Sequence, residues 1–157
     1  MKIDWKKLII CLVVPLAVGG LSALLSGSMQ EYAYLKQPPL SPPGWVFPIV
    51  WTLLYLMMGY ASYLVITSDK DAQAVRKAMN FYGAQLVLNF LWSIIFFGLE
   101  WRLVAFFVLI VLWILVYLTF HAFSGINEQA GNLMLPYLLW VTFAGYLNFG
   151  VYFLNRN

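Results

Sequence analysis

The sequence predicts an all-α integral membrane protein, a bundle of five transmembrane helices that forms a single domain over residues 1–157. Of its residues, 63% are hydrophobic and only 10% are charged, whereas a soluble domain carries about 25% charged residues. The apolar residues also form long runs, each close to the roughly 20 residues that a spanning helix needs. These runs do not alternate apolar and polar positions, as the strands of a membrane barrel would.

Five predicted spans follow one another, and nearly every charge lies between them or at the termini. They cover about residues 8–27, 43–67, 78–99, 103–123 and 133–154. The first run follows Lys2, Lys6 and Lys7, as the apolar part of a signal peptide would. It is longer than the usual 7–15 or so residues of that part, so we expect a retained span.

Basic residues distinguish the two sides of the membrane. One side of the predicted topology carries Lys2, Lys6, Lys7, Lys70, Arg76 and Lys77, and the other carries Lys36, Arg102 and Arg156. Because basic loops stay in the cytoplasm, we expect a cytoplasmic N-terminus. We expect the location to be a bacterial cell membrane.

The approach to the second span is rich in proline. Four prolines occur within six residues, at 38, 39, 42 and 43. Ser41 suits an N-cap and Pro42 suits the first helical position, so the segment is expected to be a stiff lead-in to the helix. It is either a plain connector or one wall of a pocket mouth. Pro15, Pro48 and Pro136 lie inside predicted spans, where proline kinks a helix.

The link between the third and fourth spans, residues 100–102, is so short that these helices must be antiparallel neighbours. The first span carries small residues at spacing four, Gly19 with Ala23 and Ser22 with Ser26. Such pairs allow close helix packing, either within the chain or across a dimer.

The tryptophans fall into two groups. Trp5, Trp45 and Trp101 lie at span ends, where interfacial aromatic belts occur. Trp51, Trp92 and Trp140 lie deeper, where an indole N–H needs a partner. Trp113 is also deep, but its span is otherwise aliphatic and aromatic, so we expect it to face lipid or to pack.

Three spans each present one face that mixes aromatic rings with neutral polar groups. Residues four apart share a helix face, and the three faces are Phe47, Trp51 and Tyr55; Gln85, Asn89 and Ser93, with Trp92 beside them; and Trp140, Ala144 and Asn148. Two interpretations stay open. The amides hydrogen-bond between helices, or the faces line an apolar pocket with a few placed polar groups.

Several function classes find no support in the sequence. The spans contain no Asp, Glu, Lys or Arg, which ion-driven transporters use. Cys11 is the single cysteine and His121 the single histidine, so we expect no metal site. There is no phosphate-binding glycine loop and no nucleophile motif. The net charge of +3 is too small for a nucleic-acid footprint.

At three places the chain resembles the family of tryptophan-rich sensory proteins and translocator proteins, the TspO family. They are PPLSPPGWVFPIVWTLLYLMMGYASYLV (38–65), QLVLNFLWSIIFFGLEWRLVAF (85–106) and LPYLLWVTFAGYLNFGVYFLN (135–155). The chain departs from the family at Leu40, where a tryptophan is common. The family's C-terminal sterol pattern is present only loosely, as Leu147, Tyr152 and Arg156, which puts sterol binding in doubt.

The resemblance implies a five-helix bundle, usually a homodimer in the bilayer, with an internal pocket that opens on the side of the first loop. Family ligands include porphyrins such as protoporphyrin IX, isoquinoline carboxamides, benzodiazepines and, in animals, sterols. The pocket implied here, together with the aromatic face of the second span, comprises Tyr32, Pro42, Phe47, Trp51, Tyr55, Asn89, Trp92, Trp140, Ala144 and Leu147.

Some bacterial members of the family degrade protoporphyrin in light, which would assign a catalytic role to Trp51 and Trp140. No cofactor is then required, and the porphyrin is ligand or substrate. Three functions follow as expectations: a porphyrin-binding sensory protein that supports photodegradation, a transporter or passive carrier of tetrapyrroles, lipids or sterols, and a structural membrane partner.

Overall fold

The computed structural model describes residues 2–27 and 30–156, and in this part of the chain all regular structure is helical. The helices are α1 (Trp5–Ser26), the short α2 (Gln30–Ala33), α3 (Val46–Ile66), α4 (Ala72–Ser93), which continues into the π-helical turn η1 (Ile94–Gly98), α5 (Arg102–Ile126) and α6 (Glu128–Leu154). Five helices, with α4 and η1 counted as one, are long and apolar enough to cross a membrane.

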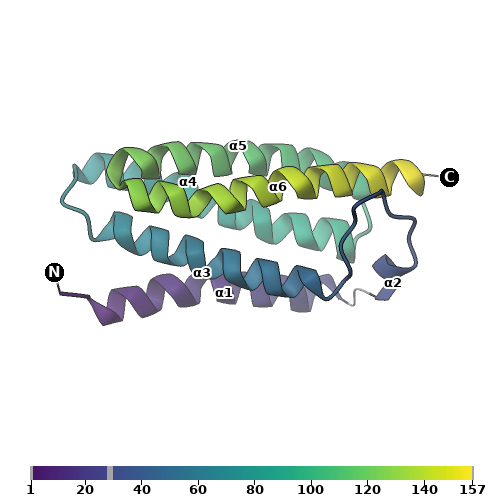
Figure 1. Cartoon of the computed structure of the whole chain (residues 1–157), viewed down its shortest axis with the longest axis horizontal. Helices are drawn as coiled ribbons and strands as arrows, with labels where there is room; N and C mark the ends of the chain where they lie inside the picture. The colour runs from purple at the N-terminus through teal and green to yellow at the C-terminus, as the bar shows by residue number, and fades with distance from the viewer. Residues whose placement is uncertain (1, 28–29, 157) are drawn as a thin grey trace.

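The five long helices form one antiparallel bundle (Figure 1). Each packs against two principal neighbours, in the order α1, α3, α6, α5, α4 and back to α1. The contact between α4 and α5 confirms that the short link makes them neighbours. Both the C-terminus and the first loop, with α2, lie at the end of the bundle opposite the N-terminus (Figure 1).

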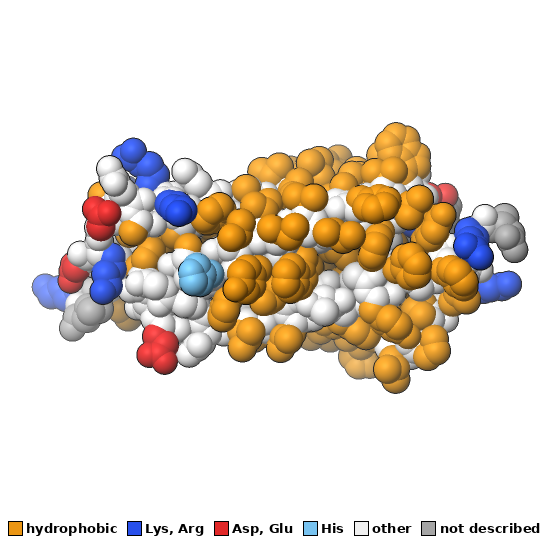
Figure 2. Space-filling model, turned by 90° about the horizontal axis from the view of Figure 1, so that it is seen from above, with side chains coloured by type: hydrophobic (Ala, Val, Ile, Leu, Met, Phe, Trp, Pro, Cys, Tyr) orange, Lys and Arg blue, Asp and Glu red, His pale blue; other side chains and the backbone are white. Residues whose placement is uncertain are grey.

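On the face shown in Figure 2, hydrophobic side chains cover much of the surface between the two ends. Lysine, arginine and acidic side chains gather at both ends (Figure 2), and Trp5, Trp45 and Trp101 are exposed near helix termini. Such a belt of apolar side chains between charged ends matches a bilayer with interfacial aromatic residues.

Several helix boundaries differ from the prediction, among them the starts of α3, α4 and α6. Helix α3 begins at Val46, and Ser41 does not cap it, because the Ser41 hydroxyl donates to the carbonyl of Pro38 at 2.7 Å. The Pro42–Pro43 pair explains the late start, since a residue before proline is disfavoured in helical conformation. Pro48 therefore falls in the first turn of α3 and not in its interior, where the prediction placed it, and amides in a first turn have no helical partner to lose.

Helices α4 and α6 begin earlier than predicted, at Ala72 and Glu128. Arg76 and Lys77 therefore lie on a helix and not in a loop. The side chain of Asn127 accepts from the amide of Ala130 at 3.0 Å and caps α6. Helices thus extend beyond the apolar runs.

Glycine at position 59 permits the contact between α1 and α3. Pro15 lies inside α1 and leaves the carbonyl of Cys11 without its helical partner. The backbone of Gly59 packs on that carbonyl so closely that an added Cβ would lie 2.5 Å from its oxygen. A side chain at this position would push the two helices apart.

We expect Gly59→Ala to lower the free energy of unfolding by about 1–3 kcal/mol, as overpacking does. Gly83→Ala in α4 is the matched control, because a Cβ there meets open space and alanine favours a helix by up to about 1 kcal/mol. Thermal melts of both variants in one detergent, followed by circular dichroism, test this. If Gly59→Ala and Gly83→Ala melt at the same temperature, the contact between α1 and α3 tolerates a methyl group.

Candidate ligand-binding cavity

A cavity of about 320 Å³ lies inside the bundle at the end that carries the first loop. Its walls come from α1, α3, α4 with η1, and α6, with Tyr32 added from α2, whereas α5 contributes no lining residue. The exposed part of its lining, which includes Gly20, Pro48 and Thr52, belongs to α1 and α3. The cavity thus reaches the surface between these two helices.

The structure brings the predicted site residues together, with one exception. Tyr32, Phe47, Trp51, Tyr55, Asn89, Trp92, Trp140, Ala144 and Leu147 all line this cavity. Pro42 is not among its lining residues, because the helix that it was expected to start begins four residues later. Whether the cavity holds a ligand is a separate question.

The indoles of Trp51 and Trp140 form the aromatic part of the wall. Their ring centroids are 6.4 Å apart and their planes are nearly perpendicular, at 86°. Trp51 stacks on Tyr55 at 5.6 Å, and Phe47 packs on Trp140 at 6.0 Å. Both indoles therefore face the interior of the bundle, where a flat aromatic molecule could pack against them.

The indole N–H groups differ in how they are satisfied. Trp92 donates to the side chain of Asn148 at 2.9 Å, and Asn148 donates onward to the carbonyl of Arg102 at 2.8 Å. The Nε1 of Trp140 is buried and has no partner within residues 2–27 and 30–156. A buried donor without a partner is costly, so the indole of Trp140 is held in place by its aromatic contacts and not by a hydrogen bond from its N–H.

A chain of neutral polar groups crosses the bundle beside the cavity. Tyr55 donates to Asn89 at 3.1 Å, Asn89 donates to the hydroxyl of Tyr137 at 2.6 Å, and Tyr137 donates to Gln85 at 2.6 Å. Asn89 thus both lines the cavity and links helices, whereas Gln85 is fully buried beyond it. Both interpretations of the polar faces therefore apply to Asn89, whereas only the interhelical hydrogen bond applies to Gln85.

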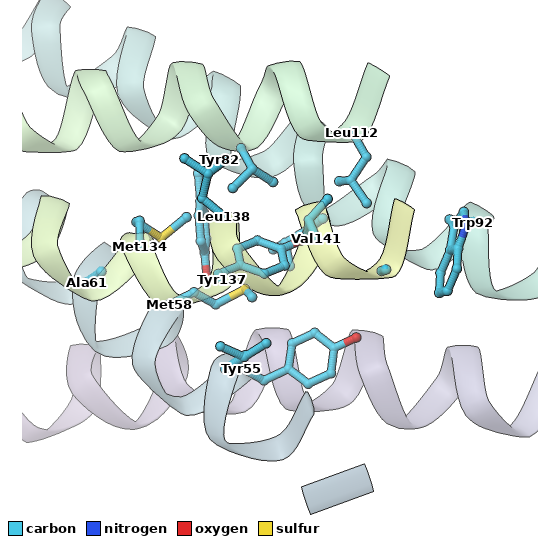
Figure 3. Packing of buried hydrophobic residues seen from close by; sticks show 14 of the residues in the cluster. Tyr55, Met58, Ala61, Tyr82, Trp92, Leu112, Met134, Tyr137, Leu138 and Val141 are labelled. Carbon is cyan, nitrogen blue, oxygen red and sulfur yellow. The ribbon is translucent and has the colours of Figure 1, made fainter. Parts of the chain in front are cut away.

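Sequence reasoning missed Tyr137, which lies at the centre of this chain and is fully buried between α6 and α3 (Figure 3). The sequence feature that could have indicated Tyr137 is its position one helical turn before Trp140, on the same side of the helix. Thr142, in contrast, faces away from the cavity and accepts from the indole of Trp113 at 2.8 Å. Trp113 thus packs across α5 and α6, as expected.

The wall formed by α1 was also missed. Gly19 lies so close to the ring of Tyr55 that a Cβ would be 2.2 Å from it. Ser22 donates to the carbonyl of Phe90 at 3.1 Å, and Ser26 and Ser93 lie within 3.0 Å of each other. Gly19, Ser22 and Ser26 therefore pack within the chain, and they leave room for the cavity.

The π-helical turn η1 places two more rings at the cavity. Phe96 stacks on Trp92 at 5.3 Å, and Phe97 packs edge-on against Tyr32 at 5.6 Å. A π-helical turn shifts the faces of the following residues, so the regular spacing that the prediction assumed fails after Ser93. Nothing in the apolar sequence of residues 94–98 indicates that a π-helical turn forms there.

Tyr32 closes the cavity from the first loop. Its ring is buried against Phe47, Phe96 and Phe97. Burial raises the pKa of the Tyr32 hydroxyl, and the nearby positive charge of Arg102 offsets part of that effect. The phenol therefore stays protonated and neutral at physiological pH.

Residues 35–41, which we call the strap, hold Tyr32 in place. The side chain of Gln37 donates to the carbonyl of Tyr32 at 3.2 Å. Asn155 makes two hydrogen bonds to the backbone of Lys36, at 3.1 and 2.8 Å, and Tyr146 donates to the carbonyl of Pro39 at 2.6 Å. Helix α6 thus fixes the strap from outside.

We expect the double variant Tyr146→Phe/Asn155→Ala to release the strap. The variant loses three hydrogen bonds. If these bonds together stabilise the strap by even about 1.4 kcal/mol, their loss makes amide exchange in this segment tenfold faster. Hydrogen–deuterium exchange of residues 32–41 measures the effect, with Tyr117→Phe on α5 as control. Unchanged exchange would show that the strap does not depend on α6.

Charged groups play little part in the cavity. None of its lining residues is Asp, Glu, Lys, Arg or His. In residues 2–27 and 30–156, no three His, Cys, Asp or Glu side chains are grouped as a metal site would require. The described site therefore offers aromatic surface and neutral hydrogen-bonding groups.

The fold and the site define a class: a five-span membrane protein with an aromatic cavity that has neutral polar groups in its wall. Comparison with known proteins identifies the family. The TspO/MBR family matches residues 11–154 of the chain, and the chain belongs to this family. It is accordingly an integral membrane protein.

Two of the relatives are similar over nearly the whole chain, and a third over three quarters of it. The "Tryptophan-rich sensory protein" of Cereibacter sphaeroides is 38% identical, with 100% of this chain and 96% of that protein covered. The "Tryptophan-rich protein TspO" of Chlorobaculum tepidum is 37% identical over 94% and 95% of the two chains. The "Translocator protein" of Bos taurus is 35% identical over 75% and 70%.

Proposed function

We propose that this protein is a membrane sensory protein that binds porphyrins or related tetrapyrroles in the aromatic cavity. The observation that carries the proposal is the cavity wall, in which Trp51 and Trp140 face each other beside Asn89 without any charged group. Its volume of about 320 Å³ lies near the lower end of the range of ligand pockets, about 300–1,000 Å³.

A porphyrin fits the chemistry of this wall. Its macrocycle is a flat aromatic plate on which indole and phenol rings can stack. Its propionates need water or polar groups, and the cavity lies at the end of the bundle that carries the first loop, where such groups are available. The macrocycle would lie against the rings of the two tryptophans, with the propionates toward the first loop.

The same arrangement would support light- and oxygen-dependent degradation of protoporphyrin IX. An excited porphyrin can pass energy to dioxygen or accept an electron, and the indoles of Trp51 and Trp140 are the closest plausible donors. A water-poor cavity protects reactive intermediates. The reaction would need no metal, acid or base from the protein.

A titration tests binding directly. Adding protoporphyrin IX to the purified protein should quench tryptophan fluorescence in a saturable way, and an isoquinoline carboxamide should restore the emission by competition. Quenching that rises linearly with porphyrin and does not respond to the competitor would reject a defined site.

One observation favours a second function, passive carriage of tetrapyrroles or lipids. The cavity reaches the surface between α1 and α3 at Gly20 and Thr52, which would face acyl chains. Carriage predicts porphyrin flux into sealed proteoliposomes above that of empty vesicles. Equal flux would reject it and would leave binding untouched.

We also propose that the N-terminus is cytoplasmic and that the protein lies in a bacterial cell membrane. The loop between α3 and α4 and the start of α4 carry Lys70, Arg76 and Lys77 at the end of the bundle where the N-terminus lies (Figure 1). Positive loops remain in the cytoplasm. Reporter fusions to each terminus would test the orientation.

A further inference from the structure

A second cavity, of about 390 Å³, lies where α5 begins and α6 ends. Its polar lining consists of Glu100, Arg102, Tyr152, Asn155 and Arg156. It shares no lining residue with the aromatic cavity. Two arginines thus line one hollow of a chain that has only nine basic residues.

The guanidinium of Arg102 is incompletely satisfied. Its side chain is half-buried, and its Nε is buried without a hydrogen-bond partner within residues 2–27 and 30–156. The group lies over the ring of Phe96, 5.5 Å from the ring centroid. A cation–π contact offsets only part of the cost of removing a charge from water.

Within residues 2–27 and 30–156, neither arginine forms a salt bridge with an acidic side chain. Glu100 lines the same cavity, but in the described part of the chain the recorded ion pair is Lys7 with Asp4, at the opposite end. Arg156 rests on the ring of Phe153, with 4.3 Å between its Cζ and the ring centroid. Two arginines and one carboxylate give the hollow a net positive charge. The planar guanidinium group of arginine can donate two parallel hydrogen bonds to the oxygens of a phosphate.

The apolar side of the cavity points to the source of that phosphate. Trp101, Leu103 and Val104 also line it, and all three are exposed. They lie at the start of α5, at the boundary between the charged end and the apolar belt. A ligand here would meet positive charge on one side and membrane-facing hydrocarbon on the other.

We propose that this cavity binds the phosphate of an anionic phospholipid headgroup, with the acyl chains along Leu103 and Val104. Basic pockets between membrane helices bind anionic headgroups on the cytoplasmic side of membranes, and the same chemistry would hold such a headgroup at this end of the bundle. The proposal does not depend on porphyrin binding, because the two cavities are lined by different residues.

Native mass spectrometry of the purified full chain tests the proposal. The protein is mixed with phosphatidylglycerol or phosphatidylcholine of identical acyl chains, and the bound lipid is counted. We expect more phosphatidylglycerol to be retained, and Arg102→Gln and Arg156→Gln each to reduce it about fivefold, as expected for loss of one basic contact. Glu100→Gln should increase it.

Lys36→Gln is the matched control, because it removes a positive charge at the same end but outside the cavity lining. Arg156 is exposed at the chain end, so its variant should fold even if Arg102→Gln does not. Equal retention of the two lipids, or equal losses in Lys36→Gln and Arg156→Gln, would overturn the proposal. Displacement of phosphatidylglycerol by millimolar inorganic phosphate would overturn the lipid assignment.

Discussion

Replacing Trp51 and Trp140 together by phenylalanine is expected to slow the light-dependent degradation of protoporphyrin IX by roughly tenfold or more. Phenylalanine keeps an aromatic ring in the wall but is far harder to oxidise than an indole. The two rings lie 6.4 Å apart and both line the cavity, so either indole could supply the electron and a single variant would retain activity.

The measurement is the loss of porphyrin absorbance under constant illumination, with dark and oxygen-free samples as references. Trp113→Phe is the matched control, since Trp113 lies between α5 and α6 outside the cavity. Degradation by the double variant at the rate of the wild type would refute the tryptophan-centred chemistry, and binding would then be judged by the titration alone.

Filling the cavity should have the second large effect. Ala144 is nearly fully buried in the wall, beside Trp140, and a phenylalanine there would occupy the space that the guest needs. We expect Ala144→Phe to weaken porphyrin binding by roughly a hundredfold, a loss of about 2.7 kcal/mol.

Leu139→Phe is the control for Ala144→Phe, because it adds a ring on the exposed face of the same helix. Fluorescence titration gives both affinities, and the melting temperature shows whether each variant folds. If Ala144→Phe folds and binds porphyrin as the wild type does, the guest does not occupy this cavity.

The fold could be predicted because the bilayer imposes a simple rule. An uncharged apolar run of about 20 residues has few alternatives to a spanning helix, and all five runs are helices in the structure. The residues at which the helices begin and end were less predictable. Ala72 begins α4 within a charged segment, where hydropathy carries no information about helix formation.

The site could be predicted where regular helix spacing holds. Trp51 and Tyr55, and Trp140 and Ala144, share faces at spacing four, and all four line the cavity. The other parts of the wall depend on contacts between helices, which the residue spacing within one helix does not reveal. The α1 wall is recognised only once Gly19 is seen against Tyr55.

A crystal structure with protoporphyrin IX tests the central claim most directly, namely that indoles and amides of several spans enclose a site for a flat guest. The account predicts density for the macrocycle in contact with Trp51 and Trp140, with Asn89 in the same site. Density only on the outer, lipid-facing surface, with the cavity unchanged, would contradict it.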